Sequence, residues 1–128
     1  MSERIKIYYA HCQAIYDTRQ EDRDIALLEQ LGFEVVNPNT EEILEGLAKF
    51  KKANPDRNSM NYFYEILEEC GALAFRSTPN GMIPCGIFSE IEFIQSLALP
   101  VIELPSMINA REMDIKQTRD YLHEIGQR

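Results

Sequence analysis

Short apolar runs alternate with longer amphipathic segments along the chain, and this alternation restricts the fold more than any other feature. The four runs are rich in residues that favour β-strands and span 5–10, 33–36, 72–75 and 100–104. Apolar residues recur at helical spacing over 17–31, 41–52, 59–70, 87–97 and 114–125. Strands and helices that alternate in this way form a parallel sheet covered on both faces. We therefore predict an α/β sandwich of flavodoxin-like (Rossmann-like) type, with three layers and four or five parallel strands.

The length and charge of the chain limit its partners. The 128 residues predict one domain over 1–128, large enough for a single core. The formal net charge of −8 argues against nucleic acid or an anionic membrane as the main partner, because either would repel the protein at long range. No apolar run reaches the ~18 residues of a membrane span, and the N-terminus lacks the apolar region of a signal peptide. We expect a cytoplasmic protein.

The motifs of common cofactor and metal sites are missing. The chain has no GxGxxG after its first strand, no Walker lysine and no GxSxG elbow. Its two histidines, His11 and His123, are far apart and lie in no ligand spacing, and three widely spaced cysteines suggest neither a disulfide framework nor a CxxC site. We expect reduced thiols, with no metal and no cofactor.

One loop and the helix after it form the best candidate for a functional site. The apolar run 72–75 leads into the loop 76–85, and an amphipathic segment follows from Ile87. In α/β folds this order places the loop and the helix N-terminus at the carboxyl edge of the sheet, where ligands bind. Gly86, Ser89 and Glu90 would then border a cleft, with Glu90 in the first turn of the helix. The structural alternative is that acids simply favour first turns, where they meet the positive end of the helix dipole.

The end of the first strand adds further candidates. Tyr8 and Tyr9 alternate, so one is expected in a core layer while the other reaches the cleft. The polar side chain of His11 follows directly after the strand. Arg19 lies where the next helix begins, and a guanidinium beside helix N–H groups would suit a phosphate. A solvated surface arginine is the alternative.

With these residues in view, the sequence resembles the nucleoside 2-deoxyribosyltransferase-like N-glycosidases, a family that includes the deoxynucleoside 5′-monophosphate hydrolases. The resemblance covers nearly the whole of 5–105. The similar segments are Ile7-Tyr8-Tyr9-Ala10, Arg19-Gln20-Glu21-Asp22, 31–38, and the spacing of Gly86, Glu90 and Leu99-Pro100-Val101-Ile102.

The resemblance implies a fold, an activity and a set of site residues. Glu90 would be the catalytic carboxylate, oriented by a hydrogen bond from Tyr8, and a nucleoside or nucleoside 5′-monophosphate would be the substrate. His11, Arg19, Asn61, Tyr62, Gly86 and Ser89 would bind it. Asn61 and Tyr62 stand near the position of a family aspartate. A homodimer whose neighbour helps to close each cleft is also implied.

Two other functions remain open on the same residues. Pro84 stands where the family has an acid or serine, and this departure favours a non-catalytic nucleotide-binding protein, such as a sensor or a sequestering protein. Retention of Glu90 favours an enzyme. A TIR-like NAD glycohydrolase is the third possibility, because that fold also uses a glutamate after a strand, a loop and a helix. The sequence leaves the base, the sugar and the phosphorylation state open.

Overall fold

The computed structural model describes residues 4–78, 80–105 and 114–127. Within them the strands are β1 (Lys6–Ala10), β2 (Glu34–Val36), β3 (Ala72–Phe75) and β4 (Val101–Glu103). The α-helices are α1 (Arg19–Gln30), α2 (Glu41–Ala53), α3 (Met60–Leu67), α4 (Cys85–Ser96) and α5 (Ile115–Glu124), and η1 (Gln13–Ile15) is a short 3-10 helix. Each strand and each α-helix lies within a few residues of the segment predicted for it from the sequence, whereas η1 was not predicted.

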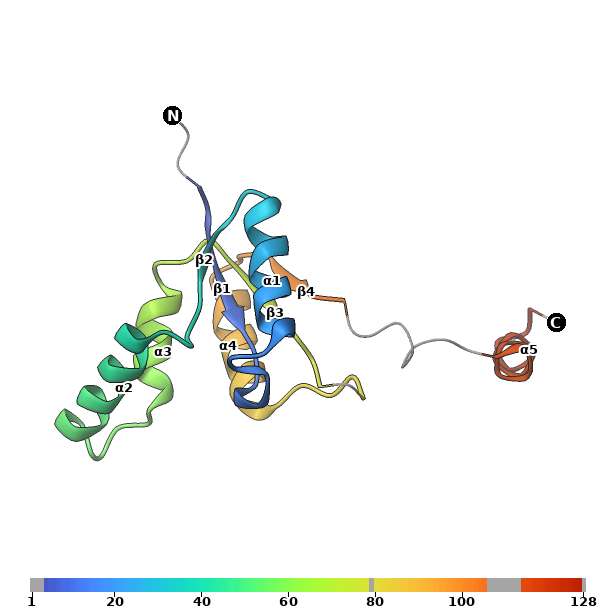
Figure 1. Ribbon diagram of the computed structural model, residues 1–128. Helices are drawn as coiled ribbons and strands as arrows, with labels where there is room; N and C mark the ends of the chain where they lie inside the picture. The colour runs from blue at the N-terminus through green and yellow to red at the C-terminus, as the bar shows by residue number, and fades with distance from the viewer. Residues whose placement is uncertain (1–3, 79, 106–113, 128) are drawn as a thin grey trace.

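The strands form one parallel sheet in the order β2-β1-β3-β4 (Figure 1). The register places Ile7 of β1 between Val35 of β2 and Ala72 of β3, and Ala74 of β3 beside Ile102 of β4. The predicted α/β class and the four parallel strands are therefore confirmed, and the strand order is consistent with a flavodoxin-like fold.

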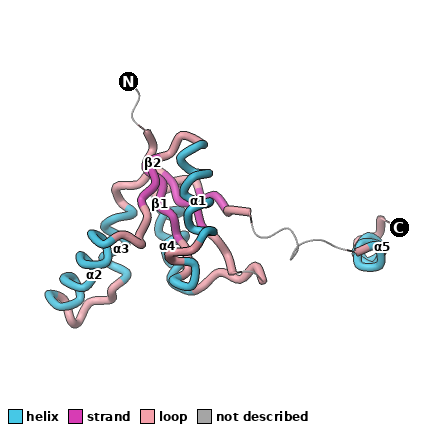
Figure 2. The backbone as a smooth tube through the Cα atoms, viewed as in Figure 1, coloured by secondary structure: helices cyan, strands magenta, loops and turns pink. Residues whose placement is uncertain are grey.

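Helices cover both faces of the sheet, because alternate residues of each strand point to opposite faces. Ile7 and Tyr9 of β1 pack with Leu28 of α1 on one face. Tyr8 and Ala10 pack on the other face, with side chains from α3 and α4. Figure 2 shows the strands between these helices. The three predicted layers are therefore present: helices, the sheet, and helices again, with one apolar core on each face of the sheet.

Local signals in the sequence set where several helices begin and end. The Thr18 hydroxyl accepts a hydrogen bond from the backbone N–H of Glu21 and caps α1, and the Thr40 hydroxyl caps α2 in the same way. Gly32 follows α1 with a φ of 98°, a conformation that glycine adopts without steric cost.

The start of α4 corrects one prediction about Glu90. The helix begins at Cys85, directly after Pro84, so Glu90 lies in its second turn and no acidic residue occupies the first. Proline suits the position before a helix because its fixed φ fits the extended backbone there and it needs no hydrogen-bond partner for a backbone N–H. The attraction of an acid to the first turn therefore does not explain Glu90.

The helices α2 and α3 lie side by side at one end of the molecule (Figure 1). The Tyr62 hydroxyl of α3 donates to the Ile43 carbonyl of α2 at 2.8 Å, and the Tyr62 ring packs against Phe50. Gly46 makes this contact possible, because a Cβ atom there would overlap the Tyr62 hydroxyl.

The helix α5 stands apart from the sheet in Figure 1. Among the described residues, none of the helices combines the length and the hydropathy that a bilayer crossing requires.

Candidate active site

The candidate site lies where the strand order reverses. From β1 the chain moves to one side of the sheet to form β2, and it later returns to the other side to form β3. The connections after β1 and β3 therefore diverge at their carboxyl ends and leave a crevice, which is the usual ligand position in open α/β sheets. His11 directly follows β1, and the loop after β3 leads into α4. The sequence-predicted cleft is therefore formed by these two connections.

A cavity of about 340 Å³ occupies this crevice. Most of its wall is apolar or aromatic, and its polar groups come from the end of β1 and from α4. The lining residues are Tyr8, His11, Cys12, Gln13, Tyr16, Pro38, Met60, Phe63, Pro84, Gly86, Ile87 and Glu90. An apolar cavity of this size with a few convergent polar groups is the usual form of a small-molecule site.

Glu90 is the carboxylate of this cavity, and it is only 7% exposed. Burial disfavours its charged form and raises the pKa of Glu90 to about 7, while a hydrogen bond from the Tyr8 hydroxyl acts in the opposite direction. A carboxyl group with this pKa is partly ionised near neutral pH, which suits a catalytic acid or base and leaves the anion available as a nucleophile.

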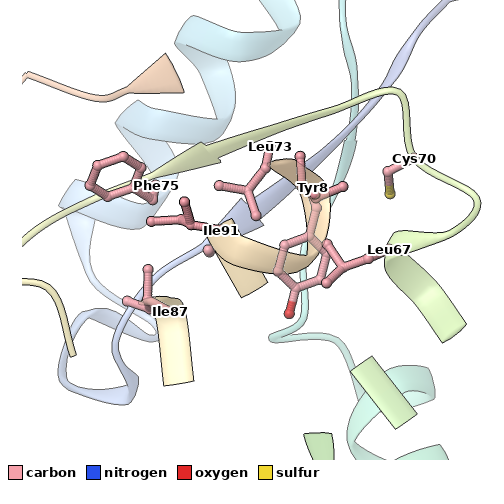
Figure 3. Packing of buried hydrophobic residues seen from close by; sticks show 9 residues of the cluster. Tyr8, Leu67, Cys70, Leu73, Phe75, Ile87 and Ile91 are labelled. Carbon is pink, nitrogen blue, oxygen red and sulfur yellow. The ribbon is translucent and has the colours of Figure 1, made fainter. Parts of the chain in front are cut away.

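Tyr8 reaches Glu90 from the central strand through the apolar core. Its ring is 1% exposed and packs with Leu67 and Leu73, and Figure 3 shows its hydroxyl at the end of the ring that points away from the strand. Burial, followed by the charge of Glu90, raises the pKa of Tyr8 well above its usual value. The phenol therefore stays protonated and donates to the carboxylate. Tyr8 and Tyr9 alternate between the two apolar cores, and both are buried, while Tyr8 also lines the cavity.

His11 is fixed by hydrogen bonds on both ring nitrogens. Nδ1 lies 2.9 Å from the Tyr9 carbonyl oxygen, and Nε2 lies 2.7 Å from a carboxylate oxygen of Glu21. The ring also stacks on Tyr9, with 3.7 Å between centroids. Asn39 donates to the same Glu21 carboxylate, which is 5% exposed. Because both nitrogens are engaged, His11 presents the face or edge of its ring to the cavity and no free nitrogen.

Tyr16 is a cavity residue that the sequence analysis missed. Its ring is half-buried and tilted against His11, with 4.8 Å between centroids. Burial and then the charge of Glu90 raise the pKa of Tyr16 to about 12, so its hydroxyl remains a hydrogen-bond donor. The available signal was its position in the connection after β1, the same connection that carries His11. Met60 and Phe63 of α3 form another part of the wall.

The cavity brings together four of the eight predicted site residues, namely Tyr8, His11, Gly86 and Glu90. The others lie elsewhere. Arg19 is exposed on the first turn of α1, and Ser89 is half-buried on α4 without lining the cavity. Asn61 donates to the Asn58 carbonyl, and Tyr62 donates to Ile43 of α2. Helical rotation separates Asn61 and Tyr62 from Met60 and Phe63, which do reach the wall.

A buried ion pair lies on the opposite face of the sheet from Glu90. The guanidinium of Arg76, just after β3, donates to both carboxylate oxygens of Asp24 at 2.6 Å and to the Pro105 carbonyl at 2.7 Å. The Tyr9 hydroxyl donates to the same carboxylate at 2.5 Å. These contacts join α1, β1 and the ends of β3 and β4, so they hold the carboxyl edge of the sheet together.

Searches of protein-family models, curated proteins and solved structures give no match for this chain. Within the described residues, no three His, Cys, Asp or Glu side chains gather as a metal site. The chemistry of the cavity is therefore the guide to what this protein does.

Burial of Glu90 predicts a specific pH dependence of stability. Because its pKa in the folded state is about 7, above the ordinary 4.5, the folded protein holds this proton more tightly than the unfolded chain. The contribution of Glu90 to the free energy of unfolding is fully present below pH 4.5 and is lost as the pH rises through 7. Glu90→Gln should therefore unfold with nearly the wild-type free energy at pH 4.5 and be more stable by roughly 3 kcal/mol at pH 8. Urea titrations at both pH values measure this difference, and the exposed control Glu92→Gln should show none.

Proposed function

We propose that this protein cleaves or transfers at the N-glycosidic bond of a nucleoside or nucleoside 5′-monophosphate, with Glu90 as the catalytic carboxylate. One observation carries the proposal: a nearly buried carboxyl group with a pKa of about 7 in an apolar cavity at the reversal point of the sheet. The cavity wall suits an aromatic base, and the carboxylate suits the positive charge that develops at the anomeric carbon.

The reaction follows from these groups in two steps. The ionised Glu90 attacks the anomeric carbon or stabilises its oxocarbenium-like charge, the carbon–nitrogen bond breaks, and the base leaves with the bonding pair and takes up a proton. Water then supplies its oxygen to the sugar and loses a proton, which completes hydrolysis. A second base in place of water completes transfer. Tyr8 holds the carboxylate in position through the hydroxyl that contacts it.

A panel of substrates tests this proposal. The protein is incubated with purine and pyrimidine nucleosides, their deoxy forms, the matching 5′-monophosphates and NAD, and free base is measured by chromatography. Release of base from a nucleoside or nucleotide supports the proposal, and release of nicotinamide from NAD alone supports the NAD glycohydrolase. Binding of a nucleotide without any free base would contradict catalysis and favour the non-catalytic binding protein.

Tyr8→Phe should move the pH profile of this activity. Loss of the hydroxyl removes the hydrogen bond that lowers the pKa of Glu90, so a higher pH is needed to ionise the carboxyl group. The rising limb of kcat/KM should shift upward by about one pH unit, the size expected for one hydrogen bond to a charged group. Tyr62→Phe serves as the control, because the Tyr62 hydroxyl bonds outside the cavity. An unchanged limb in Tyr8→Phe would exclude Tyr8 as the partner that sets this pKa.

The homodimer expected from the family resemblance belongs to the same proposal. Phe88 on α4 is 51% exposed, and Met82 in the preceding loop is 65% exposed. Neither residue lines the cavity, and an exposed apolar contact of this kind is the surface that a neighbouring copy would bury in a homodimer.

A further inference from the structure

The residues that line the cavity offer negative charge without a matching positive charge. Among its lining residues, Glu90 is a carboxylate and none is a lysine or arginine. His11 is the one lining group that can carry a positive charge, and the Glu21 carboxylate at 2.7 Å offsets that charge. The interior of the described cavity therefore has no cation to balance an anionic ligand.

Three arginines that could be considered as phosphate ligands are placed elsewhere. Arg76 is bound to Asp24 and to the Pro105 carbonyl. Arg57 lies over the Phe50 ring at 5.1 Å from its centroid. Arg19, the residue expected from the sequence to hold a phosphate, is exposed on α1 and does not line the cavity. The net charge of −8 adds long-range repulsion of anions.

We propose that this site selects its ligand by charge, accepting the uncharged nucleoside and rejecting its 5′-monophosphate, and that Glu90 is the residue that sets this preference. The inference rests on the proposed function, because it concerns the same cavity. A phosphate brought into this space loses hydration without gaining a cation, and it meets the ionised carboxylate of Glu90. The apolar wall formed by Pro38, Met60 and Phe63 favours an uncharged ring.

Calorimetry with an uncleavable ligand pair tests this preference. The pair is a C-nucleoside, whose carbon–carbon glycosidic bond resists hydrolysis, and its 5′-monophosphate. At pH 8 the wild-type protein should bind the nucleoside about tenfold to hundredfold more tightly than the monophosphate. Glu90→Gln removes the negative charge with little change in shape and should lower this ratio by about threefold or more, while the lost hydration of the phosphate maintains the rest. Glu92→Gln removes an exposed carboxylate from the same helix and should keep the wild-type ratio.

The outcomes separate this inference from the proposed function. Equal or tighter binding of the monophosphate by the wild-type protein would overturn the charge selection, while base release in the substrate panel would leave the N-glycosidase proposal intact. An unchanged ratio in Glu90→Gln would overturn the role of Glu90 in selection. If neither ligand binds and no substrate of the panel releases base, the proposed function fails, and the inference fails with it.

Discussion

Glu90→Gln is expected to reduce base release by several orders of magnitude while the protein stays folded. The amide retains the shape of the side chain, but it cannot act as an anionic nucleophile or stabilise a developing positive charge as a carboxylate does. Its burial at 7% exposure costs less than burial of a charge, so the fold should not suffer. Base release is measured by chromatography on the best substrate of the panel, and circular dichroism verifies the fold.

Glu92→Gln is the matched control for this result. Glu92 lies two residues further along α4 and is exposed, so the same chemical change there should leave the rate near that of the wild type. A Glu90→Gln protein with wild-type turnover would show that another group performs the chemistry. Equal losses in both variants would point to a general effect on α4.

Arg76→Met is expected to have the largest effect on stability. The substitution leaves the Asp24 carboxylate, 2% exposed, without the guanidinium that now donates to both of its oxygens. Removing one partner of a buried ion pair costs about 3–5 kcal/mol, because the remaining charge stays buried. The free energy of unfolding from urea titration at pH 7 should fall by this amount. The double variant Arg76→Met with Asp24→Leu should recover part of the loss, since neither charge then remains.

The exposed pair of Lys116 and Asp120 on α5 provides the comparison for this prediction. Its atoms lie 3.0 Å apart, but both side chains are largely exposed, so Lys116→Met should change the stability by less than about 1 kcal/mol. A loss in Arg76→Met as small as this would mean that water replaces the guanidinium at Asp24, and that the buried pair does not hold the sheet edge together.

The sequence predicted the architecture well because local patterns determine it. The strand at 72–75 and the helix from Glu41 need only short-range signals, an apolar run after Gly71 and a capping Thr40. Parallel pairing then follows from the alternation of strands and helices. The start of α4 was predicted two residues late, because the apolar stripe begins at Ile87 whereas the helix begins at Cys85 after Pro84.

The site was predicted only in part, because it depends on packing between distant segments. The apolar residues Ile87, Ile91 and Ile94 recur along one face of α4, and Glu90 lies outside this stripe, yet it is only 7% exposed in the structure. Its raised pKa follows from that burial and has no local signal. The Asp24–Arg76 pair joins residues 52 positions apart. The spacing of Glu21, Asp24 and Leu28 was a partial signal, because it places the two acids on the same helical face as an apolar residue. The structure buries all three.

The central claim is that this fold holds Glu90 as a carboxyl group that exchanges its proton near neutral pH. Carbon-13 NMR of the glutamate carboxyl groups, recorded across pH 3 to 9 and assigned by the signal missing in Glu90→Gln, measures it most directly. The structure predicts an apparent pKa of about 7 for Glu90. A titration near 4.5, the ordinary value for a solvated glutamate, would show that the carboxyl group is hydrated and would contradict the account of the site.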